Sequence, residues 1–216
     1  MSEFKKKSTD KKIGLAITVL LSVSLIAIAW CAYQATLWGG IQTFAIKESN
    51  SYTQQFVLKT IQQGQYSTVD VITFIEYVNS LHSEDEELIE FYYQRLRPDF
   101  KPAVDAWLET DPFENPDAPP HPFVMSEYRK TFTEEAELYF AKSAEKTEEA
   151  LVANTNSDNY VLLTVVYSIL LFLGGIQRKI SIIGNKFLLL TCLVAFSLAT
   201  VGVFSLPIAP EIILGQ

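Results

Sequence analysis

The stretch IGLAITVLLSVSLIAIAWCAY, from Ile13 to Tyr33, contains no charged side chain. In a helix that rises about 1.5 Å per residue it reaches ~31 Å, close to the hydrocarbon thickness of a bilayer. Five lysines lie within residues 1–12, and no cluster of that density follows the stretch. Because basic flanks stay on the cytoplasmic side, this stretch predicts a first transmembrane helix with a cytoplasmic N-terminus.

Two further apolar stretches follow late in the chain, and Arg178, Lys179 and Lys186 lie between them. These basic residues place that connection in the cytoplasm as well, so the three spans agree on one multi-pass topology. The predicted parts are a cytoplasmic N-terminus (1–12), a first span (13–38), an extracytoplasmic domain (39–159), a second span (160–176), a cytoplasmic loop (177–186), a third span (187–206) and an extracytoplasmic tail (207–216).

A cleavable signal peptide is the alternative interpretation of the N-terminus, because Ala27-Ile28-Ala29 resembles a small-x-small cleavage site. The apolar stretch is long for a signal peptide and continues through Trp30 and Tyr33. A retained anchor is the prediction that fits this length.

The charge is unevenly distributed along the chain. The net charge is −8 overall, but residues 39–159 alone carry −13. An acidic domain of this kind repels phosphate backbones, so nucleic-acid binding is disfavoured. The two cysteines, Cys31 and Cys192, fall in different spans at different predicted depths, so no disulfide is expected.

Residues 39–159 show helical patterns interrupted by stop and cap signals. Gly64 is a candidate helix end, Ser67-x-x-Asp70 a candidate cap, and Ser83-x-x-Glu86 a second one. Between the caps, an amphipathic helix is predicted with four residues on one buried face: Val71, Phe74, Ile75 and Val78. The sequence therefore predicts an all-α bundle inserted between the first and second spans.

The second half of this domain is rich in proline. Pro98 ends one helix, and a short helix over 103–109 carries Trp107, for which we expect a buried anchoring role. An extended, proline-stiffened loop follows at 111–122. A long helix is predicted from about Ser126, and the polar run 154–159 marks the return to the membrane.

Several stretches resemble a group of uncharacterised bacterial membrane proteins. They are WCAYQATLWGG (30–40), RLRPDFKPAVDAWLETDPFENPDAPPHPF (95–123), SEYR (126–129) and SDNYVLLTVVYSILLFLGGI (157–176). The group has one N-terminal span, a helical outer region and two C-terminal spans. The resemblance implies this architecture and carries no assigned reaction, ligand or partner.

The predicted spans contain no Asp, Glu, Lys, Arg or His, which argues against a pump or a coupled transporter. They do contain small residues at four-residue spacing, which permit close helix contacts. The first and third spans contribute three each: Gly14, Thr18, Ser22, Thr191, Ala195 and Ala199. Packing among the protein's own helices and a homo-oligomer seam are both open at this point.

Motifs for catalysis or metal binding are sparse. The only histidines are His82 and His121, and no close pair of His or Cys ligands suggests zinc. The carboxylates of the loop at 111–122 could hold a hard cation, but a rigid surface loop is the preferred interpretation. The phosphate-binding and hydrolase-elbow motifs are missing. We expect no enzyme activity, no metal and no cofactor.

The favoured function is that of an accessory or scaffold protein, which uses its outer domain to contact an unknown membrane or periplasmic protein. The alternative is a ligand-sensing receptor subunit that binds a small molecule in the bundle and needs a partner to signal. The candidate binding face mixes charges with aromatic anchors: Arg95, Arg97, Phe100, Asp105, Trp107, Asp111, Phe113 and Asn115. A purely structural role for this segment, as a brace for the bundle, is the competing interpretation.

Overall fold

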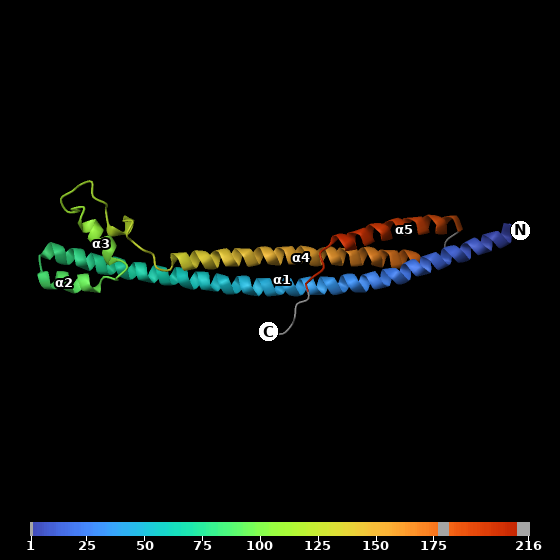
Figure 1. The fold of residues 1–216 in the computed structure, drawn as a ribbon, viewed down its shortest axis with the longest axis horizontal. Helices are drawn as coiled ribbons and strands as arrows, with labels where there is room; N and C mark the ends of the chain where they lie inside the picture. The colour runs from blue at the N-terminus through green and yellow to red at the C-terminus, as the bar shows by residue number, and fades with distance from the viewer. Residues whose placement is uncertain (1, 177–181, 211–216) are drawn as a thin grey trace. The chain divides into compact units, whose positions relative to one another are not determined.

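The computed structural model describes the backbone of residues 2–176 and 182–210, and the side chains of 12–176 and 187–210. This described part is mostly helical and contains no β-strand. Its elements are α1 (Ser2–Ser83), α2 (Glu86–Arg95), α3 (Lys101–Leu108), the 3₁₀ turn η1 (Pro122–Val124), α4 (Thr133–Gly175) and α5 (Ile182–Ser205) (Figure 1). The predicted all-α fold class is therefore confirmed.

Among the described residues, three helices are long and apolar enough to cross a membrane. They are α1 from Lys12 onward, α4, and α5 from Phe187 onward. They contain the three apolar stretches on which the prediction of a multi-pass membrane protein rested.

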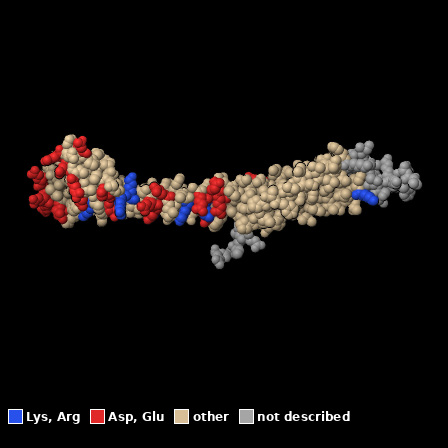
Figure 2. Space-filling view, turned by 45° about the horizontal axis from the view of Figure 1, so that its top comes forward, with Lys and Arg blue, Asp and Glu red and all other residues tan. Residues whose placement is uncertain are grey.

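The chain forms two compact units, to which α1 and α4 both contribute. We call Met1–Glu48 with Glu145–Gln216 the span unit, and Ser49–Ala144 the head unit. On the face seen in Figure 2, side chains over the described span helices are almost all uncharged, whereas acidic side chains gather over the head unit. The head unit is shorter at both ends than the predicted domain at 39–159, because the flanking residues pack with the spans.

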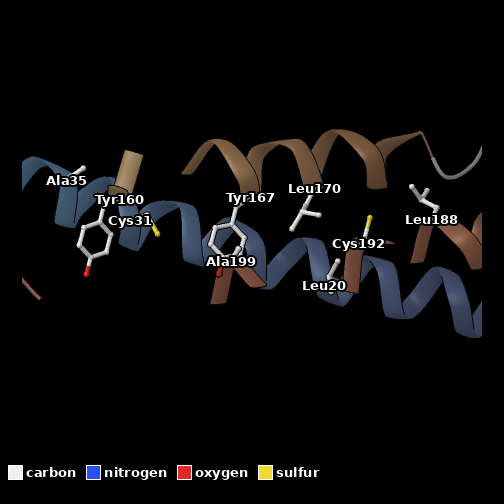
Figure 3. Packing of buried hydrophobic residues seen from close by; sticks show 9 residues of the cluster. All are labelled: Leu20, Cys31, Ala35, Tyr160, Tyr167, Leu170, Leu188, Cys192 and Ala199. Atoms are coloured by element: carbon white, nitrogen blue, oxygen red, sulfur yellow. The ribbon is translucent and has the colours of Figure 1, made fainter. Parts of the chain in front are cut away.

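The core of the span unit forms where α1, α4 and α5 meet, and Figure 3 shows its buried side chains. Tyr160, Tyr167 and Leu170 of α4 are fully enclosed there. Cys31 and Cys192 project into this core from α1 and α5 at separate levels, and both are free thiols (Figure 3). The close approach of α1 to α4 depends on Gly174, because a Cβ at that position would lie 2.5 Å from the Leu21 side chain.

The segment after α5 is fixed back onto the spans by three hydrogen bonds. The Pro207 carbonyl accepts one from Trp38 Nε1 at 3.1 Å and one from the Tyr160 hydroxyl at 3.3 Å. The buried Gln34 side chain accepts a third from the Ala209 backbone N–H at 2.9 Å. Trp38, Tyr160 and Gln34 are polar side chains of the spans, and leaving them without a hydrogen bond in an apolar setting would cost free energy.

The helix α1 is the main correction to the sequence prediction, because it continues without a break from Ser2 to Ser83. Gly64 was predicted to end a helix and Ser67-x-x-Asp70 to cap another, and both predictions were wrong. A glycine inside a helix costs only about 1 kcal/mol, which the packing of the neighbouring turns offsets. The buried face of α1 then follows one continuous phase through Asp70, Phe74 and Tyr77.

Two other predictions also need correction. The cap of α2 is Asp85, whose carboxylate accepts from the N–H groups of Glu87 and Leu88, and not Ser83. The helix predicted from about Ser126 begins only at Thr133; it is continuous through the polar run 154–159.

The proline-rich loop at 111–122 is folded into successive turns where an extended chain was predicted. The Asp111 carbonyl accepts from the N–H groups of Glu114 and Asn115, and the Asn115 carbonyl accepts from Ala118. The prolines exclude regular helix, as expected, but they leave these short-range hydrogen bonds intact.

Candidate interaction site

An aromatic cluster organises the head unit around Phe74 of α1. Its ring makes edge-to-face contacts with Phe100, Trp107 and Phe123, at centroid separations of 6.2, 5.2 and 5.8 Å. Phe100 and Phe123 stack on each other at 5.0 Å. Edge-to-face and offset pairs of this kind add stabilisation beyond the burial of the rings. The cluster therefore fixes α3 and η1 against α1.

Trp107 connects α3 to the proline-rich loop. Its ring is 5% exposed, and its Nε1–H donates to the Pro119 carbonyl at 2.7 Å. Phe113 lies edge-on to the same ring at 5.8 Å, although Phe113 itself is 55% exposed. The predicted buried position of Trp107 is confirmed, and the ring holds the loop through its hydrogen bond to Pro119.

A buried ion pair joins α1 to the segment that follows α2. Arg97 donates from Nη2 to Asp70 Oδ2 at 2.8 Å and from Nε to Asp70 Oδ1 at 3.2 Å. Asp70 is 1% exposed, and its hydrogen bonds raise the pKa of the Arg97 guanidinium. Such a fork-on-fork pair fixes direction as well as distance.

The same ion pair also holds the segment before α4. Arg97 Nη1 donates to the Thr131 hydroxyl at 2.7 Å and to Asp99 at 3.0 Å. The Tyr128 hydroxyl donates to Asp70 at 3.3 Å, and burial raises the pKa of this phenol. The carboxylate of Asp70 is thus satisfied from two sides, which is what a buried charge requires.

The predicted binding residues separate into two groups. Phe100 and Trp107 are buried, Arg97 is engaged with Asp70, and Asp105 accepts from the Tyr93 hydroxyl at 2.9 Å. The remaining four are exposed, as Asp105 is: Arg95, Asp111, Phe113 and Asn115. Three residues of the second group lie in the loop at 111–122, and Arg95 is the last residue of α2.

A second exposed feature was not predicted, namely an apolar stripe on the outward face of α1. We define the α1 stripe as six residues, each between 45% and 58% exposed: Val57, Leu58, Ile61, Val69, Ile72 and Ile75. It lies opposite the face that carries Asp70, Phe74 and Tyr77. The sequence signal for it was present, because residues 57–75 contain only two charges, but the predicted helix break at Gly64 concealed it.

The small residues of the predicted packing seam also differ in their exposure. Thr18 and Ser22 of α1 are exposed, and their hydroxyls donate to the carbonyls of Gly14 and Thr18 in their own helix. Ala199 of α5 is buried in the span core, and Ala195 packs against it. Ala195 and Ala199 therefore pack within the chain, whereas Thr191 of α5 is exposed, as Thr18 and Ser22 of α1 are.

Within the described residues, no group of three or more His, Cys, Asp or Glu side chains is placed to hold a metal ion. No protein-family model matches this chain, and neither a curated protein nor a solved structure was found to be similar to it. Its interaction surfaces must therefore be interpreted from their own chemistry.

Proposed function

We propose that this protein is a non-enzymatic accessory or scaffold protein of a bacterial cytoplasmic membrane, and that it acts through protein contacts of its head unit. The observation that carries the proposal is the α1 stripe. Exposed apolar side chains gathered on one face of an otherwise acidic unit are typical of an interaction site. The basic residues of 1–12 and 177–186 support a cytoplasmic N-terminus and an extracytoplasmic head unit.

The topology is tested by accessibility of single cysteines in a background that carries Cys31→Ala and Cys192→Ala. In intact spheroplasts, Ala118→Cys should react with a membrane-impermeant thiol reagent, while Ser2→Cys and Ser181→Cys should be protected until the membrane is opened. The side chains of Ser2 and Ser181 lie outside the described residues, so this experiment tests the sequence prediction directly. Labelling of Ser181→Cys in closed spheroplasts would rule out the three-span topology.

The exposed loop is tested by replacing Asp111 to His121 with a Gly/Ser linker of equal length. The proteins that co-purify with the full-length chain in mild detergent are then identified for both forms. If the loop is a binding surface, the replaced protein remains helical and thermally stable but loses its co-purifying protein. A strong drop in melting temperature would instead assign the loop to bracing, because Trp107 loses its hydrogen bond to Pro119. Unchanged stability and unchanged recovery would contradict both roles.

A ligand-sensing receptor subunit is the second candidate function, and one feature of the head unit favours it. An open groove of about 690 Å³ lies beside Arg97, in the segment before α4. It is lined by polar and charged side chains: Asp99, Tyr128, Arg129, Lys130, Thr131, Thr133 and Glu134. A small polar ligand there would contact the same Asp99 and Thr131 that hold Arg97. Addition of such a ligand would raise the melting temperature of the chain, whereas a scaffold would show no such effect.

A further inference from the structure

The α1 stripe follows the spacing of a coiled-coil seam. The steps between successive positions alternate between three and four residues along the following series: Leu58, Ile61, Gln65, Thr68, Ile72 and Ile75. All six of these positions are exposed. A 3.5-residue repeat keeps one face of a helix directed at a partner helix along its length.

The two polar positions of the seam are compatible with an apolar contact. Thr68 donates its hydroxyl to the Gly64 carbonyl at 2.9 Å, which leaves its methyl group as the surface it presents. The Gln65 amide makes no hydrogen bond to any of the described residues. A lone amide in an otherwise apolar seam is the type of residue that sets register and strand number in two-stranded coiled coils.

The distribution of charge favours this face as the place where a second copy of the chain approaches. The head unit contains seventeen Asp or Glu against seven Lys or Arg, so most of its surface repels a second copy. Within 57–75 the only charges are Lys59 and Asp70, and both are directed away from the stripe, paired with Glu135 and Arg97 respectively. The flanking positions that would face each other in a parallel pair are uncharged for Val57 with Gln62 and for Gly64 with Val69, and the third pair places Glu76 against Val71 at the end of the seam.

We infer that the α1 stripe binds the α1 stripe of a second copy of this chain, in a parallel two-stranded seam centred on Gln65. The inference rests on the proposed function, because it names the partner that the head unit contacts. Two copies inserted in one membrane have their α1 helices in the same direction, so the anchor itself selects the parallel arrangement. A two-fold axis then places the Gln65 amide against its own symmetry mate, where each amide can donate and accept.

The length of the seam explains why the spans are needed. Residues 57–75 cover between two and three heptads, whereas a self-sufficient coiled coil sustains about three to four. Membrane anchoring restricts two copies to a common plane and raises their effective concentration. The outward-facing Thr18 and Ser22 give the same helix a second surface where backbones can approach closely.

The first test is disulfide cross-linking of the full-length protein in its membrane, again with Cys31→Ala and Cys192→Ala. Gln65→Cys lies at the centre of the seam. The matched control is Thr60→Cys, which is exposed on the same helix. At about 100° of rotation per residue, Thr60 lies ~140° away from Gln65 around the helix axis. We expect on the order of tenfold more disulfide-linked dimer from Gln65→Cys, since facing thiols share a high effective concentration. Equal yields from both variants, or no dimer from either, would overturn the inference.

The second test is the mass of the particle in lipid nanodiscs, measured for Ile72→Asp and for the control Thr60→Asp. Ile72 is 57% exposed, so the change does not disturb the core, but it places like charges opposite each other in the pair. We expect a monomer from Ile72→Asp and a dimer from Thr60→Asp, each with unchanged helix content. A dimer from both variants would overturn the inference.

The two proposals fail in distinguishable ways. If Ile72→Asp releases a different co-purifying protein and the wild-type chain is monomeric, the stripe binds another protein, so the inference fails while the scaffold function stands. If Ile72→Asp abolishes the dimer and the wild-type chain recovers only itself, the inference stands, and the contacts of the head unit are restricted to a second copy, which contradicts an accessory role toward a different protein.

Discussion

Replacing Arg97 with alanine should lower the free energy of unfolding of the head unit by about 3–5 kcal/mol, because the change leaves a buried carboxylate without its counter-charge. Asp70 is 1% exposed, so water cannot replace the two hydrogen bonds that Arg97 donates to it. The same substitution also removes the donor to Thr131 that holds the segment before α4. The measurement is chemical unfolding of the full-length protein in detergent, followed by circular dichroism.

Arg95→Ala is the matched control, because it removes the same charge two residues earlier. Arg95 is exposed, stacks on the Phe91 ring and donates to the Phe91 carbonyl within α2. Exposed contacts of this kind contribute about 1 kcal/mol or less. A double variant with Asp70→Leu and Arg97→Met should recover most of the loss, since apolar replacement of a buried pair is often close to neutral. Equal destabilisation by Arg95→Ala and Arg97→Ala would show that the ion pair contributes nothing specific.

The spans could be predicted from the sequence because lipid imposes a strong compositional signal. A stretch such as Ile13 to Tyr33 has few alternatives once it is long, apolar and uncharged. The continuity of α1 could not be predicted in the same way. Gly64 and Ser67-x-x-Asp70 are local signals that are usually found at helix ends. Here the packing of α1 against distant residues keeps the helix continuous through both.

The pairing of Asp70 with Arg97 shows the same limit for the candidate site. Arg97 was expected on a binding face and Asp70 in a cap, and nothing local connects two residues that are 27 positions apart. The amphipathic face was partly misassigned for a related reason. Phe74 is buried as predicted, but Ile75 is 51% exposed, because the continuous helix sets its phase from Asp70 and Tyr77. The α1 stripe became recognisable only once that phase was known.

Replacing Trp107 with alanine should cost about 3–5 kcal/mol, as expected for the removal of a large buried aromatic side chain. The ring is 5% exposed, contacts Phe74 edge-to-face at 5.2 Å and is the donor that holds the Pro119 carbonyl. Loss of the ring would therefore open a cavity in the aromatic cluster and at the same time remove the hydrogen bond that holds the proline-rich loop. The readouts are the melting temperature of the full-length chain and proteolysis within 111–122.

Two variants separate the contributions of the ring. Trp107→Phe keeps an aromatic ring but removes the donor to Pro119, so it should retain more of the stability than Trp107→Ala while still exposing the loop to protease. Phe113→Ala removes a ring that is 55% exposed, and it should change stability by about 1 kcal/mol or less. If Trp107→Ala melts at the wild-type temperature, the ring is not an anchor, and the bracing role of α3 beneath the loop is wrong. If Phe113→Ala is the more destabilising change, the exposed side of the loop supports the fold, and the division between supporting and partner-facing residues has to be reversed.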